Sequence, residues 1–85
     1  MNPSVNEHTY WRAFPLTLSI MNIVERRDGV ILESDLIRLL EEEVGDFSDR
    51  ELNSALMKLE IEGLLQIREI SKGQRKISLI KKGQR

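Results

Sequence analysis

The chain of 85 residues contains no cysteine, and aromatic residues make up only 5% of it. Without cysteine it can form neither disulfides nor thiolate metal sites. Its fold must therefore depend on packed apolar side chains and on capped helix ends. Such a composition suits a reducing compartment, and we expect a cytoplasmic protein. A chain of this length forms one small domain, because it buries only about 60% of its unfolded surface.

The sequence also lacks a long hydrophobic run. The longest apolar-rich stretch covers residues 14–24 and is interrupted by Thr17, Ser19 and Asn22. A membrane-spanning helix needs about 20 apolar residues. The charged residues 25–28 that follow do not resemble the cleavage site of a signal peptide. We therefore expect no contact with a membrane.

Residues that carry out chemistry are scarce. His8 is the single histidine, and we find no glycine-rich phosphate loop and no Ser/His/Asp arrangement. The consecutive acids Glu41 to Glu43 would point in three directions on a helix, so they cannot converge on one metal ion. The sequence predicts no enzyme activity, no cofactor and no metal site.

Charge is divided along the chain although the net charge is only −1. Residues 1–65 carry six basic and thirteen acidic side chains, whereas residues 66–85 carry seven basic side chains and one acidic one. The chain is therefore acidic in its body and basic at its end.

The N-terminal residues 1–13 are polar and lack a clear period, which predicts a tail in front of one domain over residues 14–85. Three rings near its end are expected to pack back on the domain: Tyr10, Trp11 and Phe14. A first helix is predicted over 15–28, with Pro15 in its first turn and Gly29 at its end. Its apolar side recurs at helical spacing and consists of Leu16, Ile20, Ile23 and Val24.

A short β-prone run at residues 30–32 is too brief for a helix and predicts a strand. Ser34 is the expected N-cap of a second helix that ends at Gly45. Asp35 lies in the first turn of this helix, where negative charge is favourable. The buried stripe of the second helix is expected to consist of Leu36, Ile37, Leu39, Leu40 and Val44.

The third helix has the clearest start in the sequence. Ser48 and Glu51 have the spacing of a capping box, and Phe47 and Leu52 that of a hydrophobic staple. Gly63 ends the helix, which is predicted over 49–62. Its apolar face consists of Leu52, Ala55, Leu56 and Leu59.

After Gly63 the hydrophobic period changes to two, in residues 65–68 and again in residues 76–79. Turn-forming residues lie between these two strands at positions 71–74, so a β-hairpin is predicted. The order helix, strand, helix, helix, strand, strand is that of a winged helix, an α+β and mainly α fold. In this fold the short first strand can pair with the hairpin, which is the wing.

Two segments resemble a known family. Residues 55–65, Ala-Leu-Met-Lys-Leu-Glu-Ile-Glu-Gly-Leu-Leu, look like the end of the recognition helix in PadR-like and MarR-like winged-helix regulators, and residues 76–83 look like their second wing strand. The resemblance covers residues 30–83 and implies a DNA-binding regulator. It departs at Ile80, where these families carry a threonine that can cap a dimerisation helix. We therefore expect a monomer, or a homodimer formed through the first helix and the aromatic tail.

Candidate contacts with double-stranded DNA fall into three groups. On the outward face of the third helix they are Arg50, Asn53, Ser54, Met57 and Lys58. On the wing they are Arg68, Lys72, Gln74, Arg75 and Lys76. Lys81 and Lys82 at the exit of the wing are expected to contact phosphates. Lysines on a hairpin can instead protect its edges from pairing, but so large a basic excess is more than that task needs.

Two observations weigh against a protein that binds DNA mainly through its third helix. Acidic residues gather around the start of the third helix, so we expect the wing to supply more of the affinity than usual. Met57 and Ile61 lie on the outward face and favour an alternative, a module that binds another protein. Packing of Ile61 under the wing is an equally simple interpretation of that residue. Leu18, opposite the buried side of the first helix, is also expected to be exposed.

Overall fold

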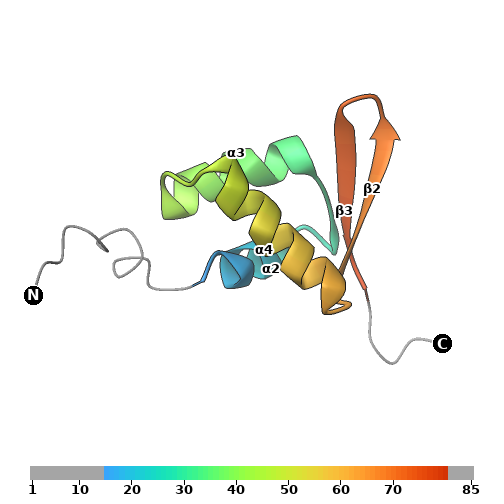
Figure 1. Ribbon diagram of the computed structural model, residues 1–85, viewed down its shortest axis with the longest axis horizontal. Coiled ribbons are helices and arrows are strands. Elements are labelled where there is room, and N and C mark those ends of the chain that lie inside the picture. The colour runs from blue at the N-terminus through green and yellow to red at the C-terminus, as the bar shows by residue number, and fades with distance from the viewer. Residues whose placement is uncertain (1–14, 81–85) are drawn as a thin grey trace, which may run out of the picture.

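The computed structural model describes residues 15–80, which form three helices and three strands. They follow in the predicted order, so the fold is α+β, mainly helical, with a winged-helix-like layout. Figure 1 shows the helices gathered on one side of the β-hairpin, whose tip extends past them. The elements are α2 (Leu16–Arg26), β1 (Val30–Leu32), α3 (Glu33–Val44), α4 (Asp49–Ile61), β2 (Leu65–Ser71) and β3 (Gln74–Leu79).

The first helix, α2, ends two residues before the predicted boundary. Pro15 is its N-cap and Arg27 its C-cap, after which Asp28 and Gly29 take positive φ angles of 62° and 88°. Aspartate is one of the few residues besides glycine that adopt this conformation readily. The chain therefore leaves α2 through two left-handed residues, where one was expected. The buried side is the predicted one, and Leu18 opposite it is exposed.

The second helix, α3, follows β1 without a loop, and this changes its start. Leu32, in extended backbone conformation, is the N-cap, and no side chain caps this end. The prediction that Ser34 is the cap is wrong, because Ser34 already lies inside the first turn. Glu33 and Asp35 supply negative charge to that turn instead, which stabilises the positive end of the helix. The end at Gly45 is confirmed, with φ of 88°.

The third helix, α4, begins as the sequence predicts and ends one residue earlier, at Ile61. The backbone N–H of Glu51 donates to Oγ of Ser48 over 3.0 Å, and the backbone N–H of Ser48 donates to Oε1 of Glu51 over 2.9 Å. These two bonds form the capping box. At the other end Gly63 has a φ of 78°, and the N–H of Leu64 donates to the carbonyl of Leu59 over 2.9 Å, as in a Schellman motif. Local hydrogen bonds thus define both ends.

The sheet is antiparallel, with β3 between β1 and β2. Ile77 of β3 lies opposite Ile31 of β1 on one side and Ile67 of β2 on the other. The expected pairing of the short first strand with the hairpin is therefore confirmed. Because side chains alternate along a strand, these three residues define the inner face of the sheet, toward the helices, and their neighbours define an outer face.

The turn of the hairpin is tighter than predicted. Ser71 pairs with Gln74, so only Lys72 and Gly73 lie between the strands. Gly73 has a φ of 75°, a left-handed conformation that glycine adopts without steric cost. The register shifts between positions 69 and 71, which leaves Ile70 as the extra residue of a β-bulge.

One hydrophobic core lies between the helices and the inner face of the sheet. Every helix and strand contributes to it, so packing determines how α4 and the hairpin stand relative to each other. Its buried members are Leu16, Ile20, Ile23, Val24, Ile31, Leu36, Leu40, Leu52, Ala55, Leu56, Leu59, Leu65 and Ile77.

Candidate nucleic-acid interface

The outer face of α4 lies opposite its buried stripe, which consists of the predicted residues Leu52, Ala55, Leu56 and Leu59. The five candidate contacts on this helix are all exposed: Arg50, Asn53, Ser54, Met57 and Lys58. A helix with this apolar stripe must turn these positions outward. The expected face is therefore confirmed, whereas its contact with DNA stays a prediction.

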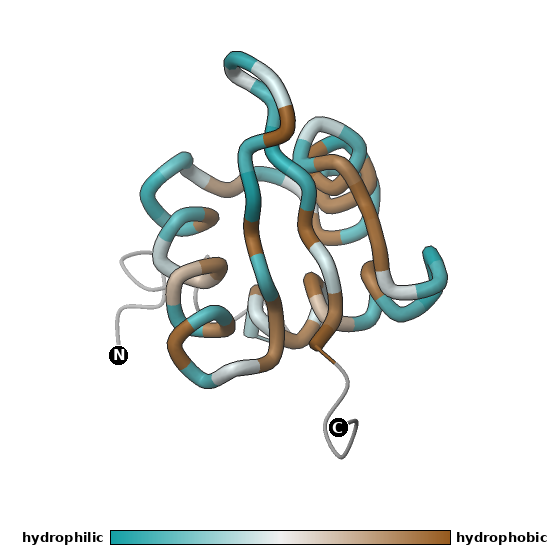
Figure 2. The backbone as a smooth tube through the Cα atoms, turned by 90° about the vertical axis from the view of Figure 1, so that its right-hand side faces the viewer, coloured by the Kyte–Doolittle hydropathy of each residue, from teal (hydrophilic) through white to brown (hydrophobic). Residues whose placement is uncertain are grey.

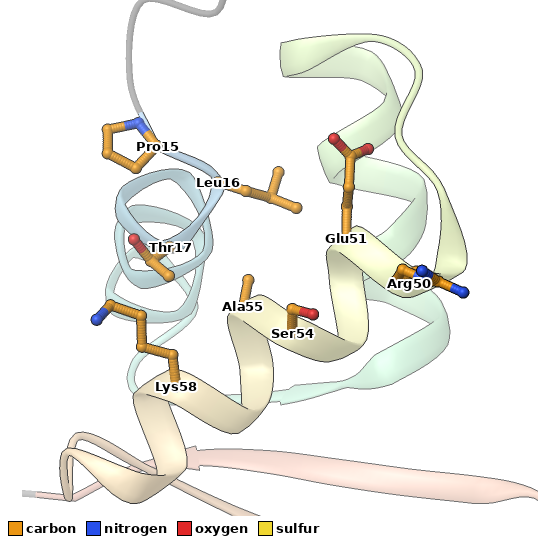
Figure 3. Close-up of a pocket in the computed structure, with 8 residues that line it drawn as sticks. All are labelled: Pro15, Leu16, Thr17, Arg50, Glu51, Ser54, Ala55 and Lys58. Carbon is orange, nitrogen blue, oxygen red and sulfur yellow. The ribbon is translucent and has the colours of Figure 1, made fainter. Parts of the chain in front are cut away.

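This outer face has two parts. Arg50, Ser54 and Lys58, one turn apart, line a groove of about 440 Å³ between α4 and the first turn of α2. Figure 3 shows Lys58 reaching toward α2, while the guanidinium of Arg50 points away from it. Met57 and Ile61 line a smaller hollow of about 320 Å³ on the same helix. Ile61 is 76% exposed, so it does not pack under the wing.

The two cations on this face differ in their partners. Nζ of Lys58 lies 3.1 Å from Oε2 of Glu62, one turn further along α4. Arg50 has no acidic partner within residues 15–80. Arg50 is thus the α4 cation that a phosphate could bind without breaking an ion pair. Its sequence neighbours Asp49 and Glu51 are both acidic and exposed.

The outer face of the sheet carries a positive pair. Arg68 on β2 and Lys76 on β3 lie directly opposite each other in the register. Neither has an acidic partner in the described part of the chain. Like charges opposite each other destabilise an antiparallel pair. The hairpin therefore bears a cost in stability and gains concentrated positive charge from an exposed Arg68 and a half-buried Lys76.

The tip of the hairpin extends beyond the body of the molecule, as Figure 2 shows. Lys72 is exposed in its turn, and among the described residues no acid pairs with it. Oε2 of Glu69 accepts a hydrogen bond from the backbone N–H of Gly73 over 3.3 Å, and Oγ of Ser71 lies 3.3 Å from Oε1 of Gln74. These contacts hold the turn in shape and leave the Lys72 side chain open.

Arg75 differs from the other wing residues because it lies on the inner face of the sheet, with Ile77. Its Nε donates to Oε1 of Glu33 over 3.0 Å and its second terminal nitrogen to Oε2 over 2.6 Å, which ties β3 to the start of α3. The hydrogen bond to Glu33 raises the pKa of Arg75, burial lowers it, and the charges of Glu33, Glu60 and Glu69 raise it further. A raised pKa means that this stabilisation is fully present below the ordinary pKa of arginine.

Most cations of the helical body are paired with acids. The pairs are Arg26 with Glu43, Arg27 with Asp35 at 3.9 Å, Arg38 with Asp35 at 2.8 Å, and Lys58 with Glu62. Residues 15–64 carry five basic and twelve acidic side chains, a net charge of −7. The hairpin, residues 65–79, carries four basic side chains and one acidic one, a net charge of +3. Basic charge that is free to bind an anion therefore lies mainly on the hairpin.

Comparison with protein-family models, curated proteins and solved structures finds no match for this chain. Within residues 15–80 no helix has the length and apolar character needed to cross a membrane. The same residues contain no group of three or more His, Cys, Asp or Glu side chains placed to hold a metal ion.

Several sequence-based predictions lie outside the described residues. They are the tail with Tyr10, Trp11 and Phe14, and the exit residues Lys81 and Lys82.

Two features of the hairpin were missed. The bulge residue Ile70 is 49% exposed beside the tip, and Glu33 holds Arg75 across 42 positions of sequence. No local pattern reveals either feature, since both arise from strand pairing.

Proposed function

We propose that this protein is a winged-helix protein that binds double-stranded DNA, with the β-hairpin as its main contact and α4 as its second. One observation carries the proposal. In the described part of the chain, the cations without an acidic partner are three on the hairpin and one on α4: Arg68, Lys72, Lys76 and Arg50. Such cations can neutralise phosphates and release counterions from DNA without first losing an ion pair.

The charge distribution explains why the hairpin would make the main contact with DNA. DNA would be repelled by the acidic start of α4, because Asp46, Asp49 and Glu51 are close to Arg50 in sequence. The hairpin tip extends past the helices (Figure 1), and residues 65–79 carry four basic side chains against one acidic one. Arg50 and Asn53 are side-chain types that bind guanine and adenine edges, so sequence preference would come from the start of α4. Phosphate contacts from the hairpin would supply the affinity.

The resemblance of residues 55–65 to the recognition helix of PadR-like and MarR-like regulators extends the proposal to the regulation of transcription. The proposal does not require Arg75 to touch DNA, because its guanidinium is held by Glu33.

Binding of a labelled DNA duplex, followed by fluorescence anisotropy at several salt concentrations, tests the proposal. The logarithm of the affinity should fall steeply with the logarithm of salt concentration. The double variant Arg68→Ala, Lys76→Ala should reduce the magnitude of this slope by about 1.8, since each lost phosphate contact accounts for about 0.9.

The matched control is Arg26→Ala, Arg38→Ala, which removes the same charge from cations that are already ion-paired. This variant should leave the slope unchanged. The proposal fails if the unmodified protein does not bind DNA at low salt, or if both double variants lower the slope equally.

A second candidate function, binding of a protein partner, is favoured by one observation. Met57 and Ile61 are 58% and 76% exposed and line one hollow of α4. Adjacent exposed apolar side chains are typical of contact surfaces. If this function is correct, DNA binding should be weak or absent, and Met57→Asp and Ile61→Asp should each abolish capture of a partner in a pull-down. A partner that is retained by both variants would exclude this surface.

A further inference from the structure

Among the described residues, a groove with an apolar floor lies between α2 and α4 on the candidate interface. Its floor is apolar, with Pro15 and Leu16 from α2 and its N-cap on one side and Ala55 of α4 on the other (Figure 3). Polar side chains line its rim: Thr17, Arg50, Glu51, Ser54 and Lys58. Its volume of about 440 Å³ lies within the roughly 300–1,000 Å³ in which proteins hold small ligands. A large apolar side chain would therefore fit.

The chain itself offers such side chains next to the groove. Residues 10–14 read Tyr-Trp-Arg-Ala-Phe and hold three of the four aromatic residues of the protein. They directly precede Pro15, which lines the groove. Phe14 is bonded to Pro15, and the Cα atom of Trp11 can lie at most roughly 14 Å from that of Pro15 along an extended chain. Both rings are thus within reach of the groove.

Tethering favours this segment over any free ligand. A group on a short flexible linker has an effective concentration of roughly millimolar at its own site. Aromatic rings also bury more apolar surface than other side chains. A separate apolar partner would have to compete with a segment that is covalently joined to Pro15, which lines the groove.

We propose that residues 10–14 bind in the groove between α2 and α4 through Trp11 and Phe14. Bound there, they cover the part of the α4 outer face that Ser54 and Lys58 form, and they leave the hairpin open. The segment then competes with DNA for α4 and weakens binding. This regulatory consequence rests on the proposed function, whereas binding of the segment itself does not.

Trp11 is the only tryptophan of the chain, so its fluorescence reports directly on the segment. In the full-length protein its emission should be blue-shifted, and its quenching by acrylamide weaker, relative to a peptide of residues 1–14. Ser54→Glu places a carboxylate at the groove and should restore the emission and quenching of the peptide. Asn53→Glu, exposed on the same helix and not part of the groove lining, is the matched control and should change neither. Circular dichroism checks that both variants are folded.

The proposal is overturned if Trp11 in the full-length protein emits like the free peptide, or if Ser54→Glu leaves its emission blue-shifted. It is also overturned if the blue shift disappears on dilution, because the segment would then bind a second copy of the chain.

A DNA-binding measurement distinguishes binding of residues 10–14 in the groove from the proposed DNA-binding function. Trp11→Ala, Phe14→Ala in the full-length protein should bind duplex DNA several-fold more tightly than the unmodified protein. Equal affinity would overturn competition for α4. A blue-shifted Trp11 in a protein that does not bind DNA would support the bound segment and refute the proposed function alone.

Discussion

The helical body and the hairpin of this protein handle charge in opposite ways. The body is acidic, and four of its five cations form ion pairs. The hairpin is basic and keeps two cations directly opposite each other, although this arrangement costs stability. It contributes only Leu65 and Ile77 to the buried core. The body thus supplies most of the buried core, whereas the hairpin carries most of the described cations that have no acidic partner.

The two regions are nevertheless joined firmly. Ile77 packs in the core between β1 and β2, and Arg75 beside it binds Glu33 at the start of α3. Alternation along β3 sends these two side chains inward and sends Lys76 outward. A single strand thus provides both the attachment and the candidate phosphate contact.

Removal of a core side chain from the body should have the largest effect on stability. Leu56 of α4 is 2% exposed, and Leu56→Ala should lower the free energy of unfolding by about 2–5 kcal/mol, through lost burial and the cavity left behind. Met57→Ala, one position along and exposed, should change it by less than about 0.5 kcal/mol. Urea unfolding monitored by circular dichroism measures both. Equal effects would contradict the assignment of the buried face of α4.

Loss of the link between the two regions should have the next largest effect. Glu33→Gln removes one charge of a partly buried bidentate pair and should cost about 1–2 kcal/mol of unfolding free energy. Asp35→Asn, whose ion pairs are on the surface, should cost less than about 1 kcal/mol.

Hydrogen exchange provides a second test of this link. In Glu33→Gln the amides of residues 72–76 should exchange faster, because β3 has lost its tie to α3. Unchanged protection of these amides would show that core packing alone positions the hairpin.

The capping box of α4 should contribute less. Ser48→Ala should lower the unfolding free energy by about 1 kcal/mol, because the N–H of Glu51 loses its acceptor. Ser34→Ala is the matched control, since Ser34 does not cap α3, and should have an effect below about 0.5 kcal/mol. Thermal or urea unfolding measures the change in unfolding free energy of both variants. A larger loss for Ser34→Ala would reverse the two assignments.

The smallest expected change in stability has the opposite sign. Lys76→Gln relieves repulsion with Arg68 and should raise the unfolding free energy by a few tenths of a kcal/mol, while it weakens DNA binding. Lys72→Gln at the tip, where no cation lies opposite, should weaken binding without this gain. If Lys76→Gln destabilises the protein, repulsion between Arg68 and Lys76 does not lower the stability of the hairpin.

Features determined by neighbours in sequence could be predicted. The capping box at Ser48 and Glu51, the glycine ends of the helices and the change of period after Gly63 all depend on a few adjacent residues. The outer face of α4 follows from the same local information, because the positions of Leu52 and Leu56 determine which side turns outward. The element order and the α4 part of the candidate site were therefore accessible from sequence.

Features determined by strand pairing could not be predicted. Ser34 has the local pattern of an N-cap, but pairing of β1 with β3 keeps Leu32 extended and starts α3 directly after it. The bulge at Ile70 and the tight turn likewise depend on register. Arg75 looks like its basic neighbours in sequence, and only the fold turns it inward toward Glu33.

The most direct test of the central claim is a titration of the full-length protein with duplex DNA, followed through the chemical shifts of its backbone amides. The account predicts that the largest changes occur in residues 66–76, with smaller ones near Arg50 and none along α3. Changes confined to the surroundings of Met57 and Ile61, or the absence of any change in the hairpin, would contradict it.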